Sequence, residues 1–335
     1  MRTSEPVCAP EPASANESDD AGLRLDWLAP FDLNLPLTLA VHRRGRGDPT
    51  FRVDADGAIW RTCLTPNGPA TIRLTARRPD VASAPDRGSP AGLLISARAW
   101  GAGAAWLAGG MPGLLGAGDN PEAFRPDHPR LRRLAQELPG LRISRTNRVL
   151  EALVPAVLEQ KVVGVEARRA WRSLLYQFGL PAPGPAPAGL RVFPPPATWQ
   201  AIGSWDWHRA GVEAVRARTI AAAARVADRL EGICSLPSAQ ADELLQSLPG
   251  IGIWTSAEIR QRAAGDPDAV SVGDYHIPGQ VGWVLAGRLV DDAGMLDLLA
   301  PYAGQRYRVT RLIELSGAGP PRRGPRMSAR DYRAI

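Results

Sequence analysis

The five residues Leu-Pro-Gly-Ile-Gly at positions 248–252 constrain the fold of this chain more than any other segment. Helical hydrophobic patterns lie on both sides, at 238–245 and 253–263, so the segment is predicted to be a tight turn between two helices. Gly250 and Gly252 permit positive φ angles and close backbone approach. The free amides and the dipole at the start of the second helix suit a phosphate. An ordinary helix–helix turn is the alternative that this segment alone leaves open.

The charge of the chain favours a polyanionic partner, with nucleic acid first among the candidates. The 335 residues carry a formal net charge of +6, and the first twenty contribute about −4, so the rest is near +10. Thirty-nine of the 40 basic residues are arginine, and Lys161 is the one lysine. A GC-rich genome also enriches arginine, alanine, glycine and proline, so charge alone does not decide the matter.

Other classes of protein find little support in the sequence. No apolar run approaches the roughly 20 residues needed to cross a bilayer, and the first residues lack the pattern of a signal peptide. Cys8, Cys63 and Cys234 are too far apart to suggest a disulfide framework or a metal cluster. We therefore expect a cytoplasmic protein with no membrane association.

The fold class predicted is α+β, namely a mainly α-helical bundle with a helix-hairpin-helix motif, preceded by a small antiparallel β-rich domain. Residues 31–98 contain β-prone segments, with the turn dipeptides Asp56-Gly57 and Asn67-Gly68 between them. The predicted strands are 35–43, 51–54, 59–65 and 70–77. Residues 96–115 are expected to be helical in part. The predicted helices are 131–138, 149–178, 198–202, 210–230, 238–245, 253–263, 278–286, 293–299 and 306–315.

Four regions follow from this pattern. Residues 1–28 are expected to be a disordered acidic tail, residues 29–125 the β-rich domain, residues 126–316 the helical domain, and residues 317–335 a basic C-terminal tail.

One acidic residue stands out after the hairpin. Asp274 follows Gly252 by 22 residues, in the sequence Val-Ser-Val-Gly-Asp-Tyr at 270–275, directly before a predicted helix. It could be simply the N-cap of that helix. It could also be an active-site carboxylate, partly desolvated at a helix N-terminus.

These residues together resemble a known family. The segment 248–255, followed at this distance by Gly-Asp-Tyr at 273–275, resembles the helix-hairpin-helix/Gly-Pro-Asp superfamily of base-excision DNA glycosylases. Residues 138–142 and 157–161 resemble the opening of the catalytic domain in 3-methyladenine DNA glycosylase II. The resemblance covers about residues 30–315. It implies a monomer, associated with the nucleoid, that binds double-stranded DNA with a damaged base and flips that base into a pocket.

The resemblance also implies roles for particular residues. Asp274 would be catalytic, stabilising an oxocarbenium-like sugar and orienting the attacking water. Aromatic side chains would stack on an alkylated purine, which is cationic, although each could equally be a core residue. The base pocket is expected from Trp254, Glu258, Tyr275 and Trp283. DNA contacts are expected from Gln160, Lys161, Gly250, Ile251, Gly252 and Thr255. Arg216, Arg218, Arg260 and Arg262 are candidates for phosphate contacts.

Four departures from the family pattern refine these expectations. Bifunctional members have a lysine where this chain has Trp254, so lyase activity by that route is not expected. No cysteine follows Cys234, so the iron–sulfur cluster of some members cannot form. Lys161 stands where a wedge residue is usually apolar, and Glu258 where this branch often has an aromatic residue. We expect no redox cofactor and no side-chain metal site, but a monovalent cation held by carbonyls of the hairpin.

The function expected is that of a monofunctional DNA glycosylase acting on alkylated purines of the 3-methyladenine type. Lys161 and Glu258 leave open a glycosylase for another lesion, hypoxanthine or uracil. A non-catalytic protein that binds damaged DNA is the alternative from another class.

Overall fold

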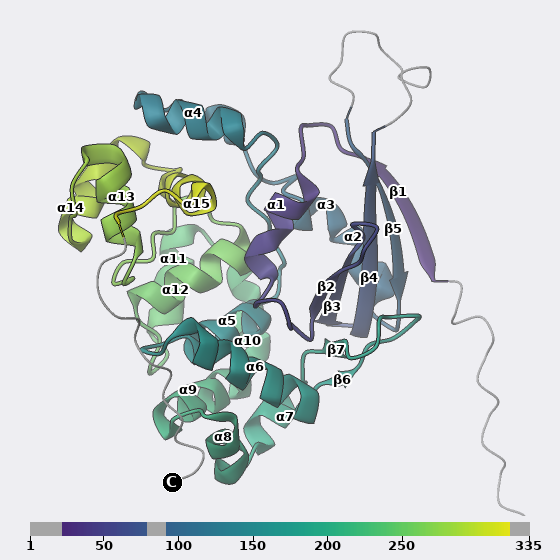
Figure 1. Cartoon of the computed structure of the whole chain (residues 1–335). Coiled ribbons are helices and arrows are strands. Elements are labelled where there is room, and N and C mark those ends of the chain that lie inside the picture. The colour runs from purple at the N-terminus through teal and green to yellow at the C-terminus, as the bar shows by residue number, and fades with distance from the viewer. Residues whose placement is uncertain (1–21, 79–91, 322–335) are drawn as a thin grey trace, which may run out of the picture.

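The computed structural model describes residues 22–78 and 92–321, which form a sheet and two groups of helices (Figure 1). The sheet is antiparallel throughout, with the strand order β1-β5-β4-β3-β2. Its strands are β1 Leu23–Leu28, β2 Phe51–Val53, β3 Ile59–Thr65, β4 Gly68–Arg77 and β5 Leu94–Trp100. The fold class predicted from the sequence is confirmed.

Both predicted hairpin turns are present. Strands β3 and β4 pair up to Thr65 and Gly68, so the loop between them is Pro66 and Asn67, one residue earlier than the Asn-Gly dipeptide. Gly68 has φ 116° and Gly57 has φ 81°, conformations that favour glycine. The predicted strand 59–65 coincides with β3.

Two expectations for the first hundred residues were wrong. Residues 35–43 are helical, as α1 Leu35–Leu39 and the 3-10 turn η2 Ala40–His42, because Asn34 Oδ1 caps Leu37 N at 3.2 Å and Pro36 occupies the first turn. Strand β1 lies inside the predicted tail 1–28, and residues 1–21 are outside the described range. The segment 96–115 is helical in part, as expected: strand β5 occupies its first residues, and α2 Ala104–Gly109 and α3 Met111–Leu114 follow.

One face of the sheet packs against α1, α2 and α3. Fully buried residues from both layers form this core, among them Leu39, Ile72, Leu74, Ile95 and Met111. A second set of contacts joins the sheet to the helices. Glu151 accepts hydrogen bonds from Leu64 N at 2.7 Å and from Arg61 at 3.0 Å.

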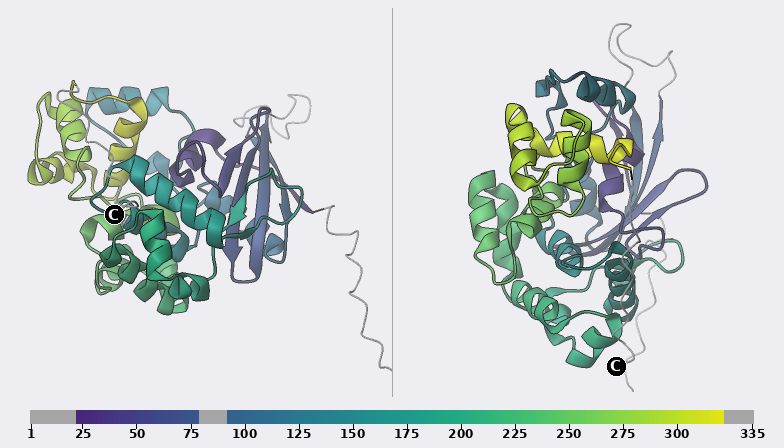
Figure 2. Two further views of the ribbon diagram at one scale, coloured as in Figure 1. Left: turned by 60° about the horizontal axis from the view of Figure 1, so that its bottom comes forward. Right: turned by 60° about the vertical axis from the view of Figure 1, so that its left-hand side comes forward.

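The helices form two lobes with separate cores. The hairpin lobe, residues 149–264, is built around α5, which is almost wholly buried, and the terminal lobe consists of residues 129–137 and 277–316. Figure 2 shows the yellow-green helices of the terminal lobe as a group of their own. The hairpin lobe contains α5 Val149–Leu158, α6 Gly164–Phe178, α7 Pro196–Ala201, α8 Ser204–Ala210, α9 Ala214–Arg225, α10 Ala227–Glu231, η5 Gly232–Ser235, α11 Ser238–Gln246, α12 Ile253–Ile259 and η6 Arg260–Ala264. The terminal lobe contains α4 Pro129–Glu137, α13 Ile277–Ala286, α14 Asp292–Leu299, η7 Ala300–Tyr302 and α15 Arg306–Ser316. The short elements η4 Pro121–Ala123, β6 Leu180–Pro181 and β7 Arg191–Val192 complete the fold.

Two long helices predicted from hydrophobic spacing are each divided. The segment 149–178 forms α5 and α6, with a loop at 159–163 in which Lys161 has φ 54°. A positive φ is incompatible with a right-handed α-helix. Gln160 and Lys161 therefore lie in this loop, and the expectation that they belong to a helix was wrong. The segment 210–230 forms α9 and α10, and α8 before it ends at Gly211 with φ 78°.

The helix after the hairpin changes its hydrogen-bonding pattern. It begins as α12 and continues as the π-helical turn η6, which ends at Gly265 with φ 68°. Single π-turns of this kind are frequent at functional sites. Among the residues described, no helix is long and apolar enough to cross a membrane. Most of the predicted basic tail 317–335 lies beyond the described range.

Candidate active site

The two glycines of the hairpin between α11 and α12 have different roles. Gly250 has φ +88°, and a Cβ there would lie 2.2 Å from Thr219 Oγ1 on α9. Gly252 has φ −101°, and a Cβ there would meet no atom within 4 Å. The expectation of positive φ therefore holds for Gly250 and is wrong for Gly252. Gly252 instead keeps the space in front of α12 open.

Backbone amides face that open space. The first intrahelical bond of α12 runs from Ser256 N to Gly252 O at 2.9 Å, so the amides of residues 253–255 precede it and have no partner within the helix. Ile251 is 5% exposed and anchors the hairpin in the core, whereas Ile253 is 52% exposed. The expected role of Ile251 in binding is therefore limited to its backbone.

Gln160 braces the hairpin from the neighbouring loop. Its Nε2 donates to Gly250 O at 2.9 Å and to Thr255 Oγ1 at 2.8 Å. The Thr255 side chain is buried, so its hydroxyl supports the hairpin from within rather than contacting a phosphate. Lys161, the next residue in the loop, is exposed.

Asp274 is held by three neutral donors. Its Oδ1 accepts from His276 N at 2.7 Å and from Ile277 N at 3.0 Å, which caps the start of α13. Its Oδ2 accepts from Trp254 Nε1 at 3.1 Å. Trp254 is on the hairpin lobe and Asp274 precedes the terminal lobe, so the carboxylate lies where the two lobes meet. The N-cap of α13 is His276, so Asp274 is not the N-cap itself, although its side chain binds the first amides of that helix.

The other residues expected in a base pocket are more scattered. Tyr275 is 86% exposed and packs edge-on against His276. Trp283 is half-buried on α13, and its carbonyl accepts from Arg130 at 3.4 Å. Neither lines either of the two cavities described below. Trp254 is the one of these aromatics that contacts Asp274 through its side chain.

Glu258 does not present a free charge. It is 8% exposed, forms an ion pair with Arg262 at 2.7 Å and accepts from Ser271 Oγ at 2.7 Å. Burial would lower the pKa of Arg262, but Glu258 outweighs it and raises that pKa above its ordinary value. Glu258 is therefore a neutralised partner that joins η6 to the segment before Asp274. Its expected place in a base pocket stays a prediction.

A polar cavity of about 350 Å³ lies between the sheet side of the molecule and α15. Arginines in ion pairs line it: Arg44 with Glu159 at 3.2 Å, and Arg311 with Glu314 at 3.5 Å. Arg262 lines it too. Its other lining residues are Ala40, Val41, Arg43, Gly45 and Arg168.

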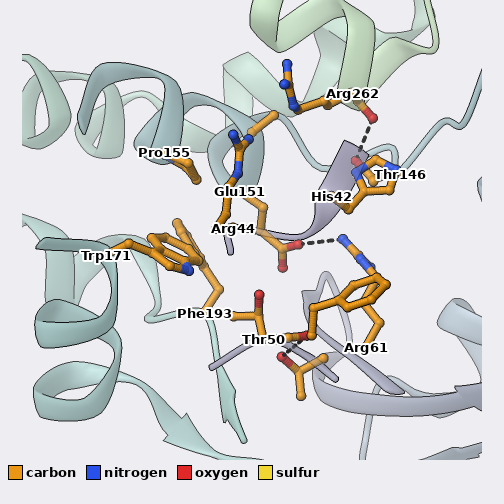
Figure 3. A pocket seen from close by; sticks show the side chains of 13 residues that line it. His42, Arg44, Thr50, Arg61, Thr146, Glu151, Pro155, Trp171, Phe193 and Arg262 are labelled. Atoms are coloured by element: carbon orange, nitrogen blue, oxygen red, sulfur yellow. Dashed lines mark hydrogen bonds and ion pairs between the residues drawn. The ribbon is translucent and has the colours of Figure 1, made fainter. Parts of the chain in front are cut away.

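A smaller pocket of about 40 Å³ adjoins it and shares Arg44 and Arg262 (Figure 3). His42 lies there, hydrogen-bonded through Nε2 to Ser144 Oγ at 2.7 Å. Burial, followed by the charges of Arg61 and Arg262, lowers the pKa of His42 well below its ordinary value. Sequence reasoning missed His42, Arg44 and Arg311, because they come from distant segments with no shared motif.

Most of the arginines expected to contact phosphate already form ion pairs or hydrogen bonds within the protein. Arg260 forms ion pairs with Asp266 at 2.6 Å and Asp242 at 3.2 Å. Arg216 is buried and donates to Leu158 O at 2.9 Å. With Arg262 paired to Glu258, Arg218 is the one of the four that is exposed.

The hairpin carbonyls retain capacity for a monovalent cation. Leu248 O accepts from Ile251 N at 3.0 Å, and Gly250 O accepts from Gln160. A carbonyl oxygen has two lone pairs, so neither bond excludes a cation. Cation binding at the hairpin stays a prediction.

Comparison with known proteins places this geometry in context. No family model matches the chain. The probable bifunctional transcriptional activator/DNA repair enzyme AlkA, from two strains of Mycobacterium tuberculosis, is 34% identical over 157 residues, or 46% of the chain. The match spans only 30% of the length of those relatives.

Solved structures resemble the chain over most of its length. The 3-methyladenine DNA glycosylase of Archaeoglobus fulgidus gives a TM-score of 0.66 at 16% identity, covering 88% of this chain and 98% of that one. The 8-oxoguanine glycosylase/lyase of Clostridium acetobutylicum, in complex with double-stranded DNA, gives 0.62 at 12% identity, covering 84% and 91%. The chain thus has the fold of the helix-hairpin-helix DNA glycosylases, and the resemblance seen in its sequence is confirmed.

Proposed function

We propose that this protein is a monofunctional DNA glycosylase that hydrolyses the N-glycosidic bond of damaged purines in duplex DNA, with alkylated purines as its first substrates. The observation that carries the proposal is the 3.1 Å hydrogen bond from Trp254 Nε1 to Asp274 Oδ2. It fixes a carboxylate beside the open N-terminus of α12, where backbone amides suit a DNA phosphate.

The chemistry follows from that placement. The hairpin amides bind a phosphate of the damaged strand, and the nucleotide is flipped out of the duplex toward Asp274. As the glycosidic bond breaks, positive charge develops on the sugar, and the carboxylate stabilises it. An alkylated purine is a good leaving group, so little acid catalysis is needed. Asp274 Oδ1 is held by the α13 amides, and Oδ2 is the oxygen beside Trp254.

Trp254 also supports the absence of strand cleavage through the hairpin. The indole N–H cannot form an imine with the sugar, whereas a lysine at this position could. Its ring can stack on a flipped base, and a cationic base gains further from an aromatic face.

The arginine-lined cavity favours a second substrate class. Trp254, Glu258 and Arg262 recur at helical spacing along α12 and η6, so this stripe leads from Asp274 toward the cavity. Glu258 is neutralised, and arginines lining the cavity can donate to the O6 and N7 acceptors of a purine. A neutral deaminated purine such as hypoxanthine fits those donors better than a cationic base does.

Base release from defined duplexes tests the proposal. Single-turnover rates are measured on DNA containing 3-methyladenine, 7-methylguanine, hypoxanthine or uracil. We expect Asp274→Asn to lower the rate on the preferred lesion by about 100-fold or more, with DNA affinity changed less than about threefold. Asp291→Asn is the control for loss of a carboxylate at a helix start, because Asp291 is the N-cap of α14 and its Oδ1 accepts from Gly294 N at 2.9 Å.

Three outcomes would contradict parts of the proposal. Full activity in Asp274→Asn would remove the catalytic assignment. Release of hypoxanthine with no release of methylated purines would replace the first substrate class by the second. Lesion-selective binding without release of any of the four bases would favour a non-catalytic protein that binds damaged DNA.

A further inference from the structure

We propose that Lys161 captures the abasic product of base removal as a reversible imine on its side-chain amine. The inference rests on the proposed function for one point, namely that the abasic sugar lies beside Asp274. It adds an activity that Trp254 cannot supply, and it uses a different loop of the protein.

The contacts around the hairpin connect the loop of Lys161 to Asp274. Asp274 Oδ2 bonds Trp254 Nε1 at 3.1 Å, Trp254 is joined by a peptide bond to Thr255, and Thr255 Oγ1 accepts from Gln160 Nε2 at 2.8 Å. Lys161 is the next residue after Gln160. Two hydrogen bonds and two peptide links therefore connect the carboxylate to the lysine, whose flexible four-carbon stem extends its reach further.

The loop that carries Lys161 is anchored by the two residues that precede the lysine. Gln160 also donates to Gly250 O at 2.9 Å, and Glu159 forms the ion pair with Arg44 at 3.2 Å. Lys161 itself is exposed and has φ 54°. A non-glycine residue rarely adopts this left-handed conformation, and such strain persists where the surroundings impose it. The loop thus holds the backbone before Lys161 against the hairpin, and the exposed side chain carries the amine outward from there.

The choice of residue favours an amine over a simple cation. Arginine is used at the other 39 basic positions of the sequence, and it would serve a phosphate contact at least as well. A guanidinium does not form an imine under these conditions, because it stays protonated. The one side-chain amine of this sequence therefore lies next to the hairpin, where an aldehyde would be produced.

The reaction is balanced without a further reagent. In its ring-opened form the abasic sugar has an aldehyde at C1′. The unprotonated Lys161 amine adds to that carbon, a proton moves from nitrogen to oxygen, and the carbinolamine loses water. The C1′=O bond is replaced by a C1′=N bond with no oxidation or reduction. Addition of water reverses the step and leaves both DNA strands intact.

Borohydride trapping on preformed abasic DNA tests the inference independently of base removal. The full chain is mixed with a labelled duplex whose abasic site was made beforehand, sodium borohydride is added, and the covalent complex is measured on a denaturing gel. We expect a complex with the natural protein and at least a tenfold smaller yield with Lys161→Arg, which keeps the positive charge. Mass spectrometry of the digested complex should locate the adduct on the peptide that contains Lys161.

Matched measurements separate the possible failures. DNA affinity and thermal stability are compared for the natural protein and Lys161→Arg, so that loss of binding or folding is not mistaken for loss of the amine. Asp274→Asn should lose base release and still be trapped. Equal trapping of Lys161→Arg, an adduct on the α-amino group, or no trapped complex from a protein that releases bases would overturn this inference and leave the glycosylase proposal standing.

Discussion

The hairpin surface and the arginine-lined cavity are both rich in hydrogen-bond donors, yet they are built in opposite ways. At the hairpin the donors are backbone amides kept open by Gly252, with the exposed Lys161 beside them. In the cavity the donors are five arginines, and three of them, Arg44, Arg262 and Arg311, each form an ion pair with a glutamate.

This difference shows that the number of arginines does not locate a polyanion-binding surface. A paired guanidinium in a half-buried site has already used much of its charge, whereas free backbone amides at a helix N-terminus have not. We therefore assign phosphate binding to the hairpin and reading of a base edge to the cavity. The following predictions test this division.

The largest effect on stability is expected where a buried ion pair is broken. Arg262→Met leaves Glu258 buried without its partner and should lower the free energy of unfolding by about 3–5 kcal/mol, measured by urea denaturation. The double variant Glu258→Met/Arg262→Met should recover most of that loss.

Arg218 is the exposed counterpart of Arg262. Arg218→Met should change the free energy of unfolding by less than about 0.5 kcal/mol. It should weaken DNA binding equally for all sequences and reduce the salt dependence of binding by about one counterion. A stable Arg262→Met or an unstable Arg218→Met would break the distinction between the two regions.

The two glycines of the hairpin should separate folding from binding. Gly250→Ala forces a Cβ against Thr219 at a positive φ and should cost about 1–3 kcal/mol of unfolding free energy. Gly252→Ala meets no protein atom and should fold normally, but its methyl group obstructs the phosphate and should lower DNA affinity. Normal DNA affinity in a folded Gly252→Ala would show that the phosphate does not approach there.

A pH dependence of stability should come from the cavity region, through His42. The folded-state pKa of His42 is lowered below 6.5, so between that folded value and 6.5 the unfolded chain binds a proton that the folded protein does not. The stability is fully present above 6.5 and is lost as the pH falls. Four arginines contribute to the lowering of this pKa: Arg61, Arg262, Arg44 and Arg311. Denaturation midpoints at pH 7.5 and 5.5 should differ less in His42→Gln than in the natural protein.

The smallest effect is a gain in stability. Lys161→Gly relieves the left-handed strain and should raise the free energy of unfolding by about 1 kcal/mol. The same variant should lose the borohydride-trapped complex. A loss of stability would mean that the lysine side chain makes a stabilising contact that outweighs the strain.

The sequence predicted the elements that depend on local signals. Strand β3, helix α4, the hairpin and helices α13 to α15 were found within one or two residues, because turn dipeptides, glycines and hydrophobic spacing act locally. It also predicted that Asp274 lies beside the hairpin, although the hydrogen bond from Trp254 could not be deduced. Hydrophobic spacing did not reveal the break at 159–163, because Lys161 adopts a conformation that its type does not favour.

The cavity could not be predicted for a different reason. Its arginines come from the segment after α1, the π-turn and α15, which are brought together by the three separate cores of the molecule. The partner of a buried charge depends on that tertiary arrangement. The pairing of Glu258 with Arg262 is the exception, because the two residues are four apart on one helical segment and their spacing in the sequence could have indicated it.

The π-turn η6 has a consequence for how relatives of this chain should be aligned. A π-turn is equivalent to one residue inserted into an α-helix, and each residue advances the helix by about 100°. A homologue that lacks the insertion would need a one-residue gap between 260 and 264 to superpose its later residues. Deleting Arg260 or Gln261 would move every later side chain back by one position. Ala263 would then occupy the position of Arg262, and the guanidinium of Arg262 would point away from Glu258. The ion pair between Glu258 and Arg262 thus depends on the number of residues in this helical turn as well as on the identity of the two residues.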